Sequence, residues 1–314
     1  MKALITGGAG FLGPALARAL VKRGDDVVLL DVAFPQGRLG DLDGKVETQV
    51  ANVAIFSEVL EAFRRHRPDS VFHLAALLSA GSIASPTEAY HVNIDGFFHA
   101  IEGVRLFDAK RVVFPSSIAS FGPGTPDPTP NEQDQKPTTL YGVSKVFGER
   151  LGEYYQRLYG LEFRCVRLPS VLGPGRGGGG MSAYSTFLIE RPIRGEPYEA
   201  YCREDTRIPL LYVDDAIEGF VRIHDAPRAK LTRNTYNVQG FSPTAGEIAA
   251  EVRRRVPGAK ITFRADPEKQ KVLDSWPRRL DDTPARDDWG WRPSVDLKGA
   301  VDGYIRALRG SSSA

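Results

Sequence analysis

The chain has few cysteines, almost no net charge and no long apolar run, and each shortage excludes a class of protein. Two cysteines, Cys165 and Cys202, are too few for a disulfide framework or a cysteine metal cluster. The 41 basic and 39 acidic residues are interspersed, so no basic stripe predicts a nucleic-acid partner. No apolar stretch approaches the roughly 20 residues of a membrane span, and Met1 leads into glycines without an apolar signal segment. We therefore expect a cytoplasmic protein with no membrane partner.

Short β-rich runs alternate with amphipathic helical patterns in the first half of the chain. The expected strands cover residues 3–5, 26–31, 46–50, 70–73, 111–114 and 166–170. The expected helices cover residues 11–23, 56–65, 86–107 and 137–159. This alternation predicts an α/β fold in which helices cover both faces of a doubly wound parallel sheet.

The sequence Gly7-Gly-Ala-Gly10-Phe-Leu-Gly13 joins the first expected strand to its helix. Gly7 permits a tight turn, Gly10 lets the backbone approach a pyrophosphate, and Gly13 allows the helix to pack closely. The first N–H groups of the helix add a partial positive charge that favours phosphate. A purely structural turn is the alternative. The position between strand and helix favours a dinucleotide site.

Asp31 closes the second expected strand, eighteen residues after Gly13. A carboxylate there can accept hydrogen bonds from both hydroxyls of the adenosine ribose and repel a 2′-phosphate, which favours NAD over NADP. The alternative is a capping or loop aspartate, and Asp26 lies at the wrong end of the strand to compete. NAD is therefore the expected cofactor.

Tyr141 and Lys145 stand four residues apart in one expected helix, and Ser116 and Ser117 follow an apolar run upstream. Residues at i and i+4 share a helix face, so the Lys145 ammonium can favour the phenolate of Tyr141. A phenol with an unperturbed pKa of ~10 is a poor base at neutral pH, and a nearby positive charge lowers that pKa. Taken alone, such a pair is more often two solvated side chains. The cofactor motif upstream favours a proton-transfer site.

Several motifs together resemble the extended short-chain dehydrogenase/reductase family, also called the NAD-dependent epimerase/dehydratase family. They are the glycine motif, His73-Leu-Ala-Ala76, Val92-Asn93-Ile-Asp-Gly96, Ser116-Ser117 followed by Phe121-Gly122, and Tyr141 with Lys145. The resemblance covers nearly the whole chain. It implies a Rossmann domain with a smaller C-terminal substrate lobe, and a homodimer built on the helices near 86–107 and 137–159.

The resemblance also implies roles for single residues. Tyr141 would be the acid/base, Lys145 would bind the nicotinamide ribose, and Ser117 would hydrogen-bond the reacting oxygen, with Ser116 as the alternative in register. Asn93 would brace the active-site backbone. The implied cofactor-binding residues are Gly7, Gly10, Phe11, Leu12, Gly13, Asp31, Asn52, Val53, Leu74, Ala75, Ala76, Asn93, Tyr141, Lys145 and Leu168.

The character of the sequence changes after Leu168. The glycine-rich segment 173–180 predicts a loop, and helices over 184–193 and 244–256 with strands over 210–213 and 236–238 predict a smaller lobe. We expect an NAD-binding domain over 1–168, a substrate lobe over 169–309 that is partly interwoven with it, and a flexible tail over 310–314.

Within the family, the closest resemblance is to the short-chain L-threonine 3-dehydrogenases. It is concentrated in 115–123, 274–277 and 285–291. Those enzymes usually carry Thr-Thr-Asp-Tyr at the substrate loop, whereas this chain has Met181-Ser182-Ala183-Tyr184 and so lacks the acidic residue. The following segment, 185–195, is more similar to sugar-acid dehydrogenases.

A small substrate that bears a carboxylate is therefore expected, either an L-threonine-like amino acid or a sugar acid. Arg207 aligns with an arginine that relatives use on a substrate phosphate, and a guanidinium binds a carboxylate equally well. Arg176, on the glycine-rich loop, is a second anion-binding candidate. The expected substrate-binding residues are Ser79, Ser117, Tyr141, Met181, Ser182, Tyr184 and Arg207. No metal site is expected, because His73 has no partner ligands at suitable spacing.

Three functions remain open on the sequence. An NAD-dependent dehydrogenase is preferred, with Tyr141 taking the alcohol proton while a hydride passes to NAD. A nucleotide-sugar 4-epimerase would use the same residues and retain its NAD. A nucleotide-sensing or scaffold protein on the same fold is the third, but such proteins tend to lose the tyrosine or the lysine, and this chain has both.

Overall fold

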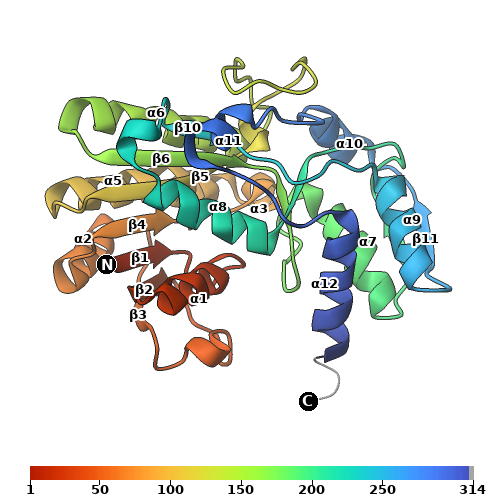
Figure 1. Cartoon of the computed structure of the whole chain (residues 1–314), viewed down its shortest axis with the longest axis horizontal. Coiled ribbons are helices and arrows are strands. Elements are labelled where there is room, and N and C mark those ends of the chain that lie inside the picture. Colours follow the sequence, from red (N-terminus) through yellow and green to blue (C-terminus); the bar gives the residue numbers. More distant parts are fainter. Residues whose placement is uncertain (311–314) are drawn as a thin grey trace.

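The computed structural model describes residues 1–310 and has a parallel β-sheet at its centre (Figure 1). Its seven strands lie in the order β10-β6-β5-β4-β1-β2-β3, and all neighbours pair in parallel. The strands are β1 (Lys2–Thr6), β2 (Asp26–Asp31), β3 (Glu47–Val50), β4 (Ser70–His73), β5 (Arg111–Ser117), β6 (Glu162–Leu168) and β10 (Thr235–Asn237). The strand order reverses between β1 and β4, and such a switch point creates a crevice at the carboxyl ends of the strands. The predicted Rossmann-type fold is confirmed.

Helices cover both faces of this sheet. One face carries α1 (Gly13–Arg23) and α8 (Val213–Asp225), and the other carries α2 (Phe56–His66), α5 (Gly96–Leu106) and α6 (Leu140–Tyr159). Successive strand residues point to opposite faces, so Ala3 and Ile5 of β1 join the α1/α8 cluster whereas Leu4 joins the α2/α5 cluster. Because both faces are buried, the central strands are apolar along their length rather than alternating.

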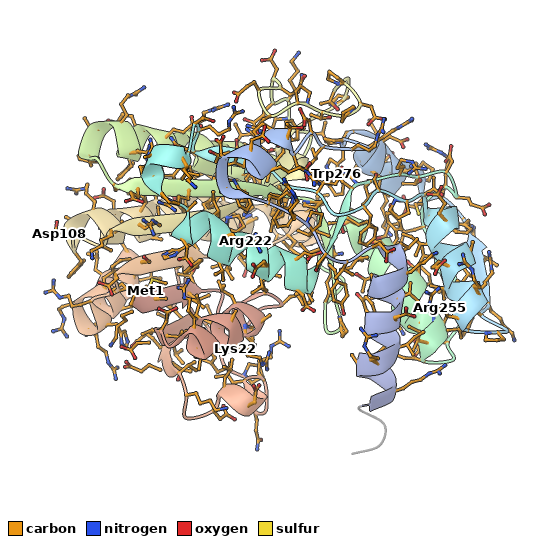
Figure 2. All side chains as sticks on the ribbon, viewed as in Figure 1. Met1, Lys22, Asp108, Arg222, Arg255 and Trp276 are labelled. Carbon is orange, nitrogen blue, oxygen red and sulfur yellow. The ribbon has the colours of Figure 1, made fainter. Side chains whose placement is uncertain are left out.

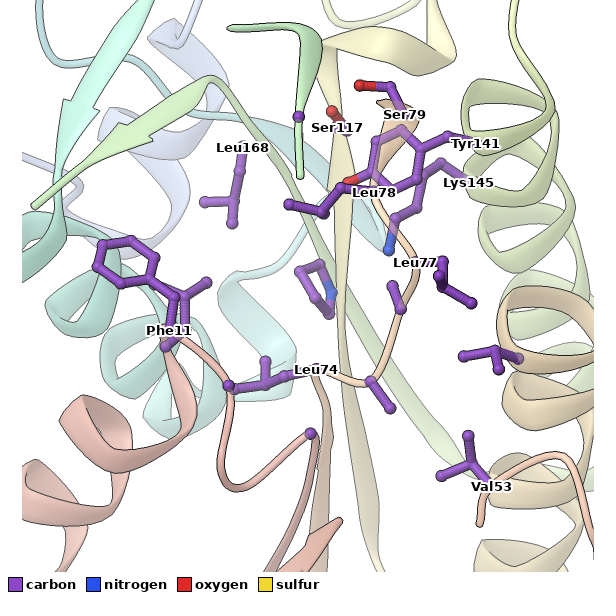
Figure 3. A pocket seen from close by; sticks show the side chains of 18 of the residues that line it. Phe11, Val53, Leu74, Leu77, Leu78, Ser79, Ser117, Tyr141, Lys145 and Leu168 are labelled. Carbon is purple, nitrogen blue, oxygen red and sulfur yellow. The ribbon is translucent and has the colours of Figure 1, made fainter. Parts of the chain in front are cut away.

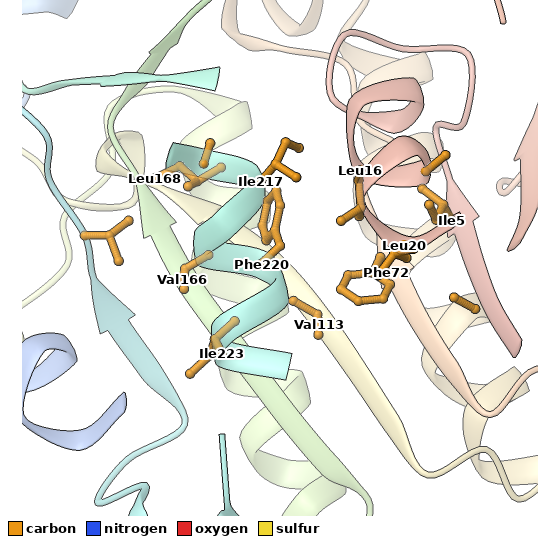
Figure 4. Close-up of a cluster of buried hydrophobic side chains, with 14 of the residues drawn as sticks. Ile5, Leu16, Leu20, Phe72, Val113, Val166, Leu168, Ile217, Phe220 and Ile223 are labelled. Atoms are coloured by element: carbon orange, nitrogen blue, oxygen red, sulfur yellow. The ribbon is translucent and has the colours of Figure 1, made fainter. Parts of the chain in front are cut away.

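The core beneath α1 and α8 fixes the position of the glycine turn that leads into α1. Leu16 and Leu20 of α1 and Phe220 of α8 are completely buried against the sheet residues Phe72 and Val113 (Figure 4). Complete burial of one such side chain stabilises the folded state by roughly 1.5–3 kcal/mol relative to an exposed side chain. The first turn of α1 is thereby held at the carboxyl end of β1.

A smaller lobe lies beside the carboxyl ends of the strands, on the right in Figure 1. It holds two short parallel sheets, β7 (Ser170–Leu172) with β9 (Leu210–Tyr212) and β8 (Tyr198–Ala200) with β11 (Ile261–Phe263). Its helices are α7 (Tyr184–Ile193), α9 (Ala245–Arg255), α10 (Pro267–Asp274) and α12 (Leu297–Gly310). A separate hydrophobic cluster that includes Tyr184, Leu188 and Tyr304 forms the core of this lobe.

The remaining elements are short. They are α3 (Ser79–Ala84), α4 (Pro86–Tyr90), α11 (Thr283–Trp289), the π-helical turn η2 (His91–Asp95), and the 3₁₀ turns η1 (Gly40–Leu42), η3 (Ile118–Ser120), η4 (Met181–Ala183) and η5 (Arg228–Lys230). The continuous helix predicted over 86–107 is thus interrupted by η2. The buried Asn93 lies in this turn and hydrogen-bonds the backbone of Leu77.

The chain returns to the first domain after entering the smaller lobe. The strand predicted over 236–238 forms as β10, but it pairs with β6 at the edge of the main sheet rather than within the lobe. Helix α8 likewise packs on the main sheet, and α11 packs against β10. The division into 1–168 and 169–309 stays a prediction, and four residues of the predicted flexible tail, 311–314, lie outside the described residues.

Charged side chains cover the outer surface, as Lys22 and Arg222 illustrate (Figure 2). Many of them form exposed ion pairs of one helical turn, such as Arg222 with Glu218. Each exposed pair of this kind contributes only about 0–1 kcal/mol to the free energy of unfolding. Within residues 1–310, none of the helices combines the length and the apolarity needed to span a membrane.

Candidate active site

A cavity of about 1080 Å³ opens at the carboxyl ends of the central strands, where a switch point places ligands. Most residues predicted to bind cofactor or substrate line it. They are Gly7, Gly10, Phe11, Leu12, Asp31, Asn52, Val53, Leu74, Ala75, Ala76, Ser79, Ser117, Tyr141, Lys145, Leu168 and Ser182. Figure 3 shows Phe11 on one side of this space and Tyr141 with Lys145 on the other. The cavity therefore joins the glycine turn to the tyrosine and lysine.

Two positions of the glycine turn at the end of β1 illustrate why glycine is needed there. Gly7 has a φ of +69°, and a Cβ there would lie 2.8 Å from the backbone nitrogen of Ala75. A Cβ on Gly13 would lie 2.5 Å from the carbonyl oxygen of Gly8. Gly13 lies outside the cavity lining, so its contribution is the close packing of α1 under the turn. The turn leaves the start of α1 facing the cavity, as a pyrophosphate site requires.

Asp31 lies at the end of β2 and lines the cavity beside this turn. Its Oδ2 accepts a hydrogen bond from the N–H of Ala9 at 2.9 Å, and its Oδ1 accepts one from the N–H of Val32 at 2.8 Å. Each carboxylate oxygen can accept a further hydrogen bond. The position and the remaining acceptor capacity of the carboxylate fit the hydroxyls of an adenosine ribose.

Asn93 lies outside the cavity and supports its wall. Its Oδ1 accepts a hydrogen bond from the N–H of Leu77 at 2.8 Å, and its Nδ2 donates to the carbonyl oxygen of Leu77 at 2.9 Å. Leu77 itself lines the cavity. The structure thus assigns Asn93 to the backbone of the site rather than to direct contact with a ligand.

Close packing between α6 and the end of β5 brings Tyr141 to Ser117. A Cβ on Gly142 would lie 2.1 Å from the carbonyl oxygen of Ala119, so only glycine lets the two segments approach. The Thr139 hydroxyl accepts a hydrogen bond from the N–H of Gly142 at 3.1 Å and caps the helix. Tyr141 therefore stands in the first turn of α6, opposite the last residue of β5 (Figure 3).

Lys145 lies one helical turn after Tyr141 and is buried. Its Nζ is 5.3 Å from the centroid of the Tyr141 ring and 4.7 Å from that of Phe114. Burial lowers the pKa of Lys145 to about 8, while the negative charge of Glu149 acts in the opposite direction. At neutral pH the Lys145 side chain is therefore mainly in its protonated form, and it lies close to the phenol.

Burial raises the pKa of Tyr141 to about 12. Its hydrogen bond with Ser117 and the positive charge of Arg176 both act to lower that pKa. Tyr141 is thus held as a phenol whose proton transfer depends on the cations around it.

The comparisons with known proteins agree with this geometry. Residues 3–238 match the model of the NAD dependent epimerase/dehydratase family. The chain belongs to this family. NAD is its cofactor, and the predicted family, cofactor and oxidoreductase class are confirmed.

The similarity to relatives within the family extends over almost the whole chain. The chain is 38% identical over 316 residues to a mitochondrial L-threonine 3-dehydrogenase of Bos taurus, covering 99% of this chain and 83% of the relative. A solved structure of a GalE-like L-threonine dehydrogenase from Cupriavidus necator superposes with a TM-score of 0.92 at 35% identity, covering 98% of this chain and all of that one. A monomeric L-threonine 3-dehydrogenase from a metagenome gives a TM-score of 0.92 at 28% identity, covering 98% and 99%.

A buried network lies beneath Lys145, and the sequence patterns did not predict it. Glu149 is completely buried and pairs with Arg167, whose Nε and Nη2 donate to its two carboxylate oxygens at 2.9 and 2.8 Å. The Ser116 hydroxyl also donates to Glu149. Ser116 is therefore engaged below the site, while Ser117 bonds Tyr141. The signal for Glu149 was available, because it lies four residues after Lys145 on the same helix face.

The substrate end differs from the prediction at three positions. Tyr184 is buried in the core of the smaller lobe, and Met181 contributes its backbone N–H to Ser79 rather than its side chain to the cavity. Arg207 also lies outside the cavity lining: it hydrogen-bonds the carbonyl oxygen of Ser242 and pairs with Glu247 at 3.3 Å. The physical reason is a tertiary contact, because Arg207 bridges to Thr244 at the start of α9 and faces that helix.

Arg176 is the arginine that lines the cavity. Its Nη1 donates to the hydroxyls of Ser170 and Thr186, and its Nη2 donates to that of Ser182. The sequence offered two anion-binding candidates, and the tertiary structure brings Arg176, not Arg207, to the space beside Tyr141.

Proposed function

We propose that this protein is an NAD-dependent dehydrogenase that oxidises the secondary alcohol of a small substrate bearing a carboxylate. One observation carries the proposal: Ser117, Tyr141 and Lys145 converge on a single cavity that also contains the glycine turn and Asp31. A hydroxyl, a phenol and an ammonium in this arrangement form a proton-transfer site beside a dinucleotide site.

The residues divide the chemistry between them. Tyr141 first gives its own proton to solvent, and as the phenolate it then takes the proton of the substrate alcohol. The Ser117 hydroxyl donates a hydrogen bond to the developing carbonyl oxygen. Lys145 favours the phenolate and is placed to hold the nicotinamide ribose. The glycine turn would hold the pyrophosphate, and Asp31 the adenosine ribose. NAD, when bound, supplies the hydride acceptor.

L-Threonine is the first substrate to test, because the bovine and Cupriavidus necator relatives are L-threonine dehydrogenases. Purified protein would be mixed with NAD⁺ and a panel that contains L-threonine, other 3-hydroxy acids and sugar acids such as erythronate. We expect NADH to accumulate with at least one member. If no alcohol of this panel yields NADH, the dehydrogenase proposal fails.

A nucleotide-sugar 4-epimerase is the second candidate, because the family model covers epimerases and the same tyrosine, lysine and serine serve both reactions. An epimerase must bind the nucleotide part of its substrate. Saturation-transfer NMR with UDP decides between the two: transfer to the uracil protons at concentrations where the hydroxy acids show none would favour the epimerase.

We also infer that two copies associate through α5 and α6. Both helices expose large apolar side chains on their outer faces, and these are Phe98, Leu106, Val143, Tyr154, Leu158 and Tyr159. A patch of this kind marks an interaction surface. Light scattering of the purified protein should give the mass of a dimer, and Leu158→Glu should give the mass of a monomer. A monomeric wild-type protein, as the metagenomic relative is named to be, would contradict this inference.

We also propose that the protein is located in the cytoplasm. The bovine relative is a mitochondrial enzyme, so the location needs its own test. Fractionation of the source cells should recover the protein with soluble cytoplasmic markers.

A further inference from the structure

Arg176 projects from the glycine-rich loop and is held in one orientation by three hydroxyls. Its Nη1 lies 2.9 Å from the Ser170 oxygen and 3.2 Å from that of Thr186, and its Nη2 lies 2.8 Å from the Ser182 oxygen. All three hydroxyl-bearing residues are buried, and they come from β7, η4 and α7. These contacts use three of the five N–H donors of the guanidinium. The donors that remain are the Nε–H and one Nη2–H, and Arg176 lines the cavity.

This guanidinium has no carboxylate partner among residues 1–310, unlike the other arginines of the interior. Arg167 pairs with Glu149 at 2.8 Å, and Arg164 pairs with Glu162 at 2.6 Å. The groups that interact electrostatically with Arg176 are tyrosines, and burial lowers its pKa. Arg176 is only partly exposed, and a partly desolvated cation without a counter-charge favours an anionic ligand. The contrast with Arg164 and Arg167 indicates that the partner of Arg176 comes from outside the chain.

Arg176 and the reacting groups border one cavity. It lines the same cavity as Ser117 and Tyr141, and its charge is near enough to lower the pKa of Tyr141. A carboxylate bound bidentately on the guanidinium would therefore hold a neighbouring hydroxyl-bearing carbon beside the Tyr141 oxygen.

The same end of the cavity offers no carboxylate for an ammonium group. The carboxylates that line the cavity are Asp31 and Glu88. Asp31 is bound to the glycine turn, and Glu88 is exposed in the first turn of α4. Ala183, where the L-threonine dehydrogenases have an aspartate, is buried at the start of α7. An α-ammonium placed between Arg176 and Lys145 would face two positive charges without a counter-ion.

We propose that Arg176 binds the carboxylate of the substrate and thereby selects hydroxy acids over amino acids of the same carbon skeleton. The proposal rests on the proposed dehydrogenase function for its substrate class. It assigns a positioning and specificity-determining role to a loop residue, and it predicts that the preferred substrate differs from that of the L-threonine dehydrogenases.

The role of Arg176 is tested by ligand binding rather than by turnover. A failure of this proposal is then distinct from a failure of the proposed dehydrogenase function. Calorimetry on the protein saturated with NADH would compare 2,3-dihydroxybutanoate, its methyl ester and L-threonine. The ester lacks the carboxylate charge, and L-threonine replaces one hydroxyl by an ammonium. We expect the wild type to bind the dihydroxy acid roughly 10- to 100-fold more tightly than either of the other two, the range of a charge-assisted hydrogen-bond pair.

Three variants separate recognition from folding. Arg176→Gln should lose the preference for the acid over its ester and leave the affinity for NADH unchanged. Arg176→Lys, which keeps the charge without the fork, should retain part of that preference. Arg194→Gln is the matched control, because Arg194 ends α7 in an exposed pair with Glu190 and should behave as wild type.

Several results would overturn the proposal. They are equal affinity of the wild type for acid and ester, L-threonine binding as tightly as the dihydroxy acid, an unchanged acid preference in Arg176→Gln, and no measurable binding of the acid. If Arg176→Gln does not fold, the affinities of the wild type and of Arg176→Lys for the three ligands still test the role of Arg176. Binding of the acid without NADH formation from any alcohol would instead count against the dehydrogenase alone.

Discussion

Glu149 lies one helical turn after Lys145, and its carboxylate is bound bidentately by Arg167 in the interior of the protein. The two residues are 0% and 4% exposed, so neither charge is solvated by water. Arg167 also donates to the carbonyl oxygen of Asn131 at 2.7 Å, and Glu149 accepts a further bond from Gln135. This ion pair ties α6 to β6 directly below the tyrosine and lysine of the site.

Glu149→Ala should therefore lower the free energy of unfolding by about 3–5 kcal/mol, because it leaves the Arg167 guanidinium buried without its partner. Urea denaturation measures this change. Glu153→Ala is the control, since Glu153 forms an exposed one-turn pair with Arg150 on the same helix. That variant should change stability by less than about 1 kcal/mol. Equal losses in the two variants would contradict a structural role for the buried pair.

Tyr141→Phe should reduce kcat roughly 10²- to 10⁴-fold, the usual contribution of a positioned acid/base. The affinity for NADH should change little, because the substitution removes only the hydroxyl. Steady-state rates and a cofactor titration measure the two effects separately. Tyr198→Phe provides the control: the Tyr198 hydroxyl is buried without a hydrogen-bond partner in the described part of the chain and lies outside the cavity lining. A Tyr141→Phe enzyme with normal turnover would exclude the proposed mechanism.

The stability of the protein should depend on pH through Lys145. Burial lowers its pKa in the folded protein to about 8 from an ordinary value of 10.5, so the unfolded chain binds the proton more tightly. The cost of burying the charge is present in full below pH 8 and is relieved as the pH rises through 8 toward 10.5. Compared with Lys145→Met, the wild type should gain up to about 3 kcal/mol across this window. Parallel urea titrations of the two proteins along the pH range measure this difference in stability. A difference that stays constant with pH would refute the lowered pKa of Lys145.

Asp31→Asn should weaken the preference for NAD over NADP. The aspartate repels a 2′-phosphate, and removing a like-charge contact is worth on the order of 10- to 100-fold in the ratio of affinities. Fluorescence titration with NADH and NADPH gives that ratio. Asp26→Asn is the control, because Asp26 lies exposed at the opposite end of β2. An unchanged ratio in the Asp31 variant would remove this residue from cofactor selection.

Local patterns in the chain were enough to predict the fold, and most residues that they assigned to cofactor binding line one cavity. Strand β2 forms over the predicted residues 26–31 and β4 over 70–73, because apolar runs bounded by turn residues depend mainly on neighbouring sequence. The glycine turn and Asp31 belong to one continuous strand-helix-strand unit, so their proximity follows from their spacing. Tyr141 and Lys145 share a helix face for the same reason.

Only the tertiary structure decided the substrate end, because its parts come from segments far apart in the chain. Arg176 and Arg207 are equivalent as isolated arginines, and it is the packing of the glycine loop against β7 and α7 that brings Arg176 into the cavity. The antiparallel bridge from Arg207 to Thr244 directs the other arginine toward α9. The return of β10 to the main sheet is equally non-local. The sequence by itself determined the chemistry that the site performs, and long-range packing determined which cation meets the substrate.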